Sequence, residues 1–199
     1  MLKSFYQEEL MEAGCDEAGR GCLAGPVFAA AVILPPDFRH PQINDSKKLS
    51  EAIRYKLRDE IMKMAIAYAV ASVDQLKIDE INILQASILA MHKALKLLNP
   101  YPEFILVDGN RFKAFNKIPH KCIIKGDGIF CSIAAASILA KTFRDDYMRQ
   151  LHEEFPEYKW NENKGYPTLF HREAIKVYGI TEHHRKSFIH QEEQLKLDL

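Results

Sequence analysis

The sequence predicts an α/β protein in which helices flank a mixed β-sheet. Two apolar segments with the properties of strands come first along the chain, and strands and helices then alternate. This order is typical of a mixed sheet with helices packed on its faces. Residues 103–107 are almost wholly apolar, which fits a strand in a sheet that is covered on both sides.

Three strands and one helix are expected in the first half of the chain. Prolines flank the second strand and favour a strand over the short helix that its alanines would also allow. Ser50 has a side chain suited to cap a helix that ends near Met62. The strands are expected at residues 11–16, 27–34 and 64–73.

Two long helices are predicted in the rest of the chain. Asp79 is the expected N-cap of a helix over residues 80–98, where apolar side chains recur every three or four positions. Small side chains in the first half of a helix over residues 130–154 permit close packing against the sheet. Further strands are expected at 103–107 and 119–125, and a short helix at 172–178.

The composition is that of an ordinary soluble globular protein. The chain has 199 residues, of which 47% are hydrophobic and 27% are charged, so one domain with a good core is expected. No apolar run reaches the roughly 20 residues that span a bilayer, and the N-terminus does not resemble a signal peptide. We therefore expect a cytoplasmic protein without membrane contact, whose four cysteines are reduced and buried.

Acidic residues stand at the ends of three predicted strands. Asp16 and Glu17 end the first strand, and Asp108 and Asp127 follow two later strands, each beside glycine. Open sheets of this kind bind ligands at strand ends. Neighbouring residues of a regular strand point to opposite faces, so Asp16 and Glu17 share one site only if the strand ends or twists there.

These acids predict a metal site. Converging carboxylates repel one another unless cations lie between them, and Mg²⁺ and Mn²⁺ prefer oxygen ligands. Two such ions roughly 3.5–4 Å apart can drive the in-line hydrolysis of a phosphodiester. One acid beside a glycine is better explained as a turn former or a helix cap, but three acidic strand ends in one sheet favour metal binding.

Several motifs follow one another from residue 16 to about residue 188. They are Asp16-Glu17-Ala18-Gly19-Arg20-Gly21, Asp45-Ser46-Lys47-Lys48-Leu49-Ser50, Val107-Asp108-Gly109-Asn110-Arg111, Lys125-Gly126-Asp127, Ala134 to Lys141 with Arg144-Asp145, Lys164-Gly165-Tyr166-Pro167-Thr168, and His184-Arg185-Lys186-Ser187-Phe188. No single motif is decisive. In this order, over nearly the whole chain, they resemble the bacterial ribonuclease HII family.

The resemblance implies a single RNase H-like domain over residues 1–199, with a core at about 1–155 and a C-terminal helical extension at about 156–199. It implies an endonuclease that cleaves the RNA strand of RNA–DNA hybrids and incises DNA at single ribonucleotides, leaving 5′-phosphate and 3′-hydroxyl ends. The duplexes would be the partners of a monomeric enzyme. The catalytic acids, which would hold two ions of Mg²⁺ or Mn²⁺ during catalysis, are Asp16, Glu17, Asp108 and Asp127.

Selecting RNA at one nucleotide requires a contact to the ribose 2′-hydroxyl. The backbone of Gly19-Arg20-Gly21 can approach a ribose closely. In the resembled family this loop and the tyrosine matching Tyr166 read the junction between ribonucleotide and deoxyribonucleotide. Cys22 and Pro167 depart from the family's usual proline and glycine there, so they bear on substrate preference. The expected phosphate contacts are Lys47, Lys48, Ser137 and Lys141.

Two other charged groups have simpler interpretations. The run from His183 to Lys186 predicts a surface patch that binds the nucleic-acid backbone, and Arg144 with Asp145 predicts an ordinary ion pair on a helix surface. Two alternative functions also remain open, a DNA-resolving nuclease on the same fold and a non-catalytic hybrid-binding module. The Gly-Arg-Gly loop and Tyr166 favour ribonucleotide recognition over the first, and the presence of all four acids argues against the second.

Overall fold

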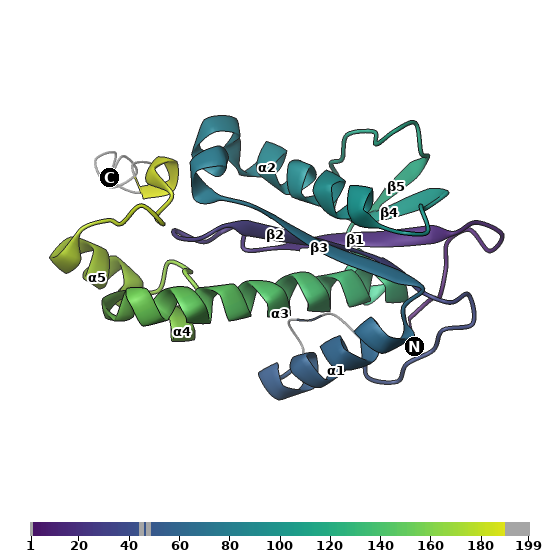
Figure 1. Cartoon of the computed structure of the whole chain (residues 1–199), viewed down its shortest axis with the longest axis horizontal. Coiled ribbons are helices and arrows are strands. Elements are labelled where there is room, and N and C mark those ends of the chain that lie inside the picture. Colours follow the sequence, from purple (N-terminus) through teal and green to yellow (C-terminus); the bar gives the residue numbers. More distant parts are fainter. Residues whose placement is uncertain (1, 44–45, 47–48, 190–199) are drawn as a thin grey trace.

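The protein is described by a computed structural model that covers residues 2–43, 46 and 49–189 (Figure 1). Its centre is a five-stranded sheet with the order β3-β2-β1-β4-β5. The strands are β1 (Glu12–Ala18), β2 (Val27–Ile33), β3 (Ala67–Val73), β4 (Phe104–Asp108) and β5 (His120–Ile123). β2 pairs antiparallel with β1 and β3, whereas β4 pairs parallel with β1 and β5. The mixed sheet confirms the predicted fold class.

Helices cover both faces of the sheet, as Figure 1 shows. α2 (Gln75–Leu97) lies on one face, and α3 (Cys131–Glu154) lies on the other with α1 (Glu51–Met64) beside it. α3 packs directly on β1 at Gly14, where a Cβ atom would lie 2.2 Å from the carbonyl carbon of Ser132. Two apolar clusters therefore form the core, one between the sheet and α2 and the other between the sheet, α3 and α1.

The C-terminal part of the described chain packs against the second half of α3. It contains the 3-10 helix η3 (Pro156–Tyr158) and the helices α4 (Trp160–Asn163) and α5 (Leu169–Tyr178). Tyr158 and Trp160 bury their rings against Met148 and Leu151 of α3. The start of a separate extension near residue 156 stays a prediction.

Several expected boundaries were wrong for local reasons. α2 begins at Gln75 because Asp74, rather than Asp79, caps it by accepting a hydrogen bond from the Lys77 N–H. The helix is kinked at Asn82, whose φ is 66°. The Asp79 carboxylate instead accepts hydrogen bonds from the backbone of Lys186 and Ser187.

Other boundaries follow from caps and helix length. Ser50 caps α1 as expected, but α1 continues to Met64 and delays the start of β3 to Ala67. Thr168 caps α5, which therefore begins three residues before the predicted Arg172. All four cysteines are free, as expected, but only three are buried, because Cys122 is partly exposed. No helix in the described ranges has the length and apolar character needed to cross a membrane.

Candidate active site

A cavity of about 270 Å³ opens where β1 and β4 end side by side. Its lining contains most of the predicted site residues, together with three that were not predicted to belong to the site, Ala18, Ser46 and Arg54. The residues that line it are Asp16, Glu17, Ala18, Gly19, Arg20, Gly21, Ser46, Arg54, Asp108, Ser137, Lys141 and Tyr166. Lys47 and Lys48, which the sequence also predicted here, lie outside the described residues.

Asp16 and Glu17 both line this cavity although they are neighbours on β1. The strand continues to Ala18, so it does not end after Asp16 as predicted. The backbone N–H of Glu17 donates to the Asp16 carboxylate at 2.7 Å, which turns the Asp16 side chain back toward Glu17. The two acids therefore share one site, as the metal hypothesis required.

The electrostatics of the cavity are those of crowded carboxylates. Burial raises the pKa of Asp16 well above its ordinary value, and the charges of Glu17 and Asp108 raise it further. A hydrogen bond from Ser137 opposes the rise. Burial likewise raises the pKa of Glu17. Arg20 lowers this pKa, and the charge of Asp108 raises it. A cation among these carboxylates would relieve both effects.

Glu17 and Asp108, like Asp16, accept hydrogen bonds from donors in the protein. Arg20 Nη1 lies 2.9 Å from Glu17 Oε1, and the Gly126 N–H donates to Asp108 Oδ1 at 2.7 Å. Within residues 2–43, 46 and 49–189, no group of three His, Cys, Asp or Glu side chains is arranged to hold a metal ion. The donor set nevertheless consists of carboxylate oxygens, which suits Mg²⁺ or Mn²⁺.

Asp127 lies close to this cavity without lining it. It belongs to η2 (Gly126–Gly128), the turn that follows β5, and only 5% of it is exposed. The preceding residue, Gly126, is the one whose N–H contacts Asp108. The structure thus brings Asp16, Glu17 and Asp108 to one cavity, and a metal-binding role for Asp127 stays a prediction.

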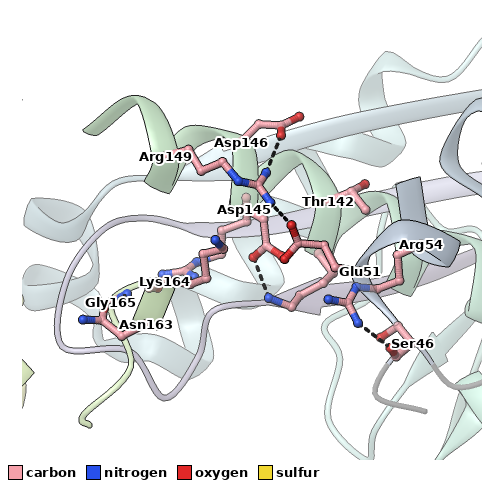
Figure 2. A network of polar contacts seen from close by, with 12 residues as sticks. Ser46, Glu51, Arg54, Thr142, Asp145, Asp146, Arg149, Asn163, Lys164 and Gly165 are labelled. Atoms are coloured by element: carbon pink, nitrogen blue, oxygen red, sulfur yellow. Dashed lines mark hydrogen bonds and ion pairs between the residues drawn. The ribbon is translucent and has the colours of Figure 1, made fainter. Parts of the chain in front are cut away.

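A chain of polar contacts connects Asp16 to the loop before α1. Ser137 lowers the pKa of Asp16 by hydrogen bonding, and its Oγ lies 2.9 Å from the Oγ of Ser46. Arg54 Nη1 donates to the carbonyls of Ser46 and Leu49, the first of which Figure 2 shows. Arg54 stands one helical turn after the cap Ser50, a spacing from which its contact with this loop might have been inferred.

Asp145 is buried beside the cavity and is not part of a surface ion pair, so that prediction was wrong. Its side chain is 1% exposed, and its Oδ1 lies 2.5 Å from Lys141 Nζ. In Figure 2 it lies between Lys164 and the ion pairs that Arg149 makes with Glu51 and Asp146. A buried carboxylate this close restrains the Lys141 ammonium at the cavity wall.

Arg144 is also buried and ties three segments together. Its guanidinium donates to the carbonyls of Pro26 at 3.0 Å, Ala24 at 3.1 Å and Lys164 at 2.8 Å. It also lies 5.9 Å from the centre of the Tyr166 ring. α3 therefore fixes the loop after β1 and the turn that carries Tyr166 relative to one another.

Tyr166 stands at the cavity with 38% of its surface exposed. Burial raises the pKa of its hydroxyl, and the nearby Cys22 thiol raises it further. Cys22 itself is fully buried. Cys22, which departs from the family pattern, is therefore buried next to Tyr166, the tyrosine predicted to read the junction.

The prediction of a surface patch at residues 183–186 was wrong for its two central residues, His184 and Arg185. His184 is 1% exposed and Arg185 is fully buried, so neither side chain is available to a phosphate. Both residues point inward because the segment pairs with the loop after β1, with a bridge between Ala24 and His184 and a hydrogen bond from the Gly25 N–H to the carbonyl of His183.

Two buried histidines connect this segment to Tyr166. The Thr181 N–H donates to His184 Nδ1, which leaves the proton of a neutral His184 on Nε2, 3.3 Å from His171 Nε2. His171 Nε2 also accepts from Trp160 at 3.0 Å, so its own proton lies on Nδ1 and faces the Tyr166 carbonyl at 2.9 Å. Both imidazoles are therefore held in the neutral form.

We expect this pair to make the protein less stable in acid. Burial and the neighbouring His171 and His183 lower the pKa of His184 to about 3. An unfolded histidine takes up a proton near pH 6.5, so the free energy of unfolding falls by at most about 1.4 kcal/mol per pH unit from there down to about pH 3. Above pH 6.5 both states are neutral and this contribution disappears.

Urea denaturation of the wild type and of His184→Asn between pH 7.5 and pH 5 measures the effect. The asparagine does not titrate, and its Oδ1 can still accept from Thr181. The Asp and Glu residues are the same in both proteins, so their titration cancels when the two free energies of unfolding are subtracted. The stability gap in favour of the wild type should narrow as the pH falls, and a constant gap would contradict the assignment.

The family model for ribonuclease HII matches residues 13–191. A ribonuclease HII from Christiangramia forsetii is 61% identical over 197 residues, which cover 99% of this chain and 100% of that protein.

Solved structures share the architecture. The PCNA:RNase HII complex from Archaeoglobus fulgidus matches with a TM-score of 0.75 at 28% identity, covering 89% of this chain and 94% of that one. Bst-RNase HIII in complex with Mn²⁺ matches with a TM-score of 0.65 at 20% identity, covering 84% of this chain and 62% of that one. At that identity the second likeness concerns the fold alone.

Proposed function

The chain belongs to the ribonuclease HII family, and we propose that it incises duplex DNA at single embedded ribonucleotides in addition to cleaving the RNA strand of RNA–DNA hybrids. It is a ribonuclease H, a nuclease of a family that acts on RNA–DNA hybrids. We assign it a dependence on divalent metal ions. One observation carries the proposal. The Gly19-Arg20-Gly21 backbone and the carboxylates of Asp16, Glu17 and Asp108 line the same cavity.

The proposed ligands of two divalent ions, Mg²⁺ or Mn²⁺, are Asp16, Glu17, Asp108 and Asp127. When bound, the ions would activate a water molecule and stabilise the leaving 3′-oxygen, so that the products carry 5′-phosphate and 3′-hydroxyl ends. The protein supplies fixed carboxylates for this purpose. Ser137 supports one of them, because it hydrogen-bonds Asp16 from α3.

Cations around the cavity would hold the substrate backbone. Lys141 lines the cavity and is restrained by Asp145, so its ammonium can meet a phosphate at little entropic cost. Lys47 and Lys48 follow Ser46, which also lines the cavity, and we assign them the same role. Phosphate contacts of this kind position a duplex without reading its sequence.

We further propose that the enzyme acts as a monomer in the cytoplasm, as one domain with a helical extension from about residue 156. The extension would contribute to the site through Tyr166, which lies in the turn before α5 and lines the cavity. A tyrosine ring beside the Gly-Arg-Gly loop can stack on a nucleotide that the loop has selected.

A panel of end-labelled duplexes tests this function. It contains a DNA duplex with one ribonucleotide, a long RNA–DNA hybrid, an all-DNA duplex and an all-DNA branched junction. We expect cleavage of the first two substrates and none of the others. Cleavage of the branched junction with an intact one-ribonucleotide duplex would instead identify a DNA-resolving nuclease.

Gly21→Ala is expected to reduce ribonucleotide recognition without destabilising the fold. A Cβ atom at Gly21 would meet no protein atom within 4 Å, so the methyl group would project into open space beside the cavity. A ribose held against the backbone would collide with it. We expect kcat/KM on the one-ribonucleotide duplex to fall by about tenfold or more, since a misplaced substrate costs on the order of 10²-fold.

The melting temperature of Gly21→Ala should equal that of the wild type, which separates a substrate effect from a folding defect. Unchanged kcat/KM in this variant would show that no ribose approaches the backbone at this position.

A further inference from the structure

We propose that Arg185 is a positioning residue for ribonucleotide recognition, because it holds the peptide group between Arg20 and Gly21 with the Gly21 N–H facing the substrate. The inference deepens the proposed function and rests on it. Arg185 comes from the segment after α5, 165 residues along the chain from the loop that it binds. Its role is distinct from phosphate binding, because its side chain is fully buried.

The contacts of Arg185 are with the backbone of the loop after β1. Its Nη1 donates to the Arg20 carbonyl at 2.9 Å, and its Nε donates to the Gly25 carbonyl at 2.9 Å. Its own N–H donates to the Leu23 carbonyl at 2.7 Å. One residue therefore fixes the loop at three carbonyls spread over six consecutive positions.

The contact with Arg20 determines the direction of a donor. A trans peptide is planar, and its C=O and N–H point in opposite directions. Since the Arg20 carbonyl points inward to the buried guanidinium, the N–H of the next residue, Gly21, must point away from it. Gly19, Arg20 and Gly21 line the cavity, so the outward direction is that of the substrate.

Arginine suits this task better than any other side chain. Its planar guanidinium can bond two carbonyls at once in a fixed geometry, and it stays charged at neutral pH. Burial lowers the pKa of Arg185 to about 10, with Cys22 foremost among the groups that oppose the shift. Burying a cation whose Nη2 has no hydrogen-bond partner among the described residues is costly. The three hydrogen bonds from Arg185 to the loop carbonyls offset part of this cost and restrain the loop.

Arg144 provides the contrast within the same structure. It is also buried, but it binds the carbonyls of Ala24, Pro26 and Lys164, which lie outside the Gly19-Arg20-Gly21 loop. Loss of Arg144 would therefore disturb several segments around the site. Loss of the Arg185 guanidinium would act directly on the peptide group between Arg20 and Gly21.

The test compares binding to two duplexes that differ in one hydroxyl group. In the Asp108→Asn background, where cleavage is removed, dissociation constants are measured for a one-ribonucleotide duplex and for the matched all-DNA duplex. Arg185→Lys keeps the charge but loses the two-carbonyl fork. We expect the ratio of the two constants to fall by about tenfold, with weaker binding of the ribonucleotide duplex and unchanged binding of DNA.

A merely structural role for Arg185 would weaken both complexes equally and leave the ratio unchanged, and that result would overturn the inference. Arg149→Lys is the matched control, because Arg149 pairs with Glu51 and Asp146 at the partly exposed surface and should not affect the ratio. Equal binding of both duplexes by the background protein would also overturn the inference. Failure of the proposed function is a separate outcome, seen as an intact one-ribonucleotide duplex in the cleavage panel.

A second measurement keeps the inference testable if Arg185→Lys does not fold. The Gly21 amide resonance of the ¹⁵N-glycine-labelled Asp108→Asn protein is followed while each duplex is added. We expect a larger downfield shift with the one-ribonucleotide duplex, because the amide then donates to the hydroxyl oxygen. Equal shifts with both duplexes would overturn the inference.

Discussion

Asp108→Asn is expected to abolish cleavage while binding of an RNA–DNA hybrid survives. Asp108 ends β4 and shares the cavity with Asp16 and Glu17, so the substitution removes one proposed metal ligand from the centre of the site. The asparagine oxygen can still accept from the Gly126 N–H, which preserves the local fold. Since a metal contributes several kcal/mol to the transition state, we expect kcat to fall on the order of 10³-fold or more.

Single-turnover cleavage and filter binding on one hybrid duplex measure the two effects separately. Asp59→Asn, at an exposed position of α1, is the matched control and should cleave normally. The melting temperature of Asp108→Asn should not fall, because the substitution also removes a charge that raises the pKa of Asp16 and Glu17. Unchanged cleavage would refute the assignment of Asp108 to the metal site.

Gly19→Ala is expected to destabilise the protein and abolish cleavage of both hybrid and one-ribonucleotide substrates. A Cβ atom there would lie 2.0 Å from Arg144 Nε, and the φ of Gly19 is +92°. Arg144 cannot move aside without breaking its three bonds to backbone carbonyls. Strained backbone and a displaced buried arginine together should cost about 3 kcal/mol or more.

Urea denaturation and the duplex panel together test this prediction. The informative comparison is with Gly21→Ala, two residues away, where the same methyl group meets no protein atom. Gly19→Ala should lose stability and all activity, whereas Gly21→Ala should lose activity alone. Equal stability of the two variants would contradict the described packing of Arg144 against the loop.

The sheet, its helices and the acidic strand ends were predictable because they depend on local patterns. Alternating apolar strands and helices defined the architecture, and Ser50 marked the start of α1. The N-cap of α2 was misplaced because Asp74 and Asp79 are equally suited to capping. Only the contact of Asp79 with the distant Lys186 and Ser187 distinguishes them.

The buried residues that hold the site in place could not be predicted either, because their roles depend on tertiary contacts. Arg144 and Arg185 have the sequence context of surface cations, and both become buried because backbone carbonyls of the loop after β1 converge on them. Asp145 is likewise defined by its burial beside Lys141. The contacts of Arg144 and Arg185 with the loop after β1 join segments more than 100 residues apart, and no local pattern specifies them.

The central claim is that metal-dependent hydrolysis and ribose selection occur in one cavity. Cleavage of a DNA duplex with a single ribonucleotide, in the presence of Mg²⁺ or Mn²⁺ and with the ends mapped at nucleotide resolution, tests it most directly. We predict a metal-dependent cut on the 5′ side of the ribonucleotide that leaves a 5′-phosphate. An intact duplex, or a cut at deoxyribonucleotides regardless of where the ribonucleotide lies, would contradict it.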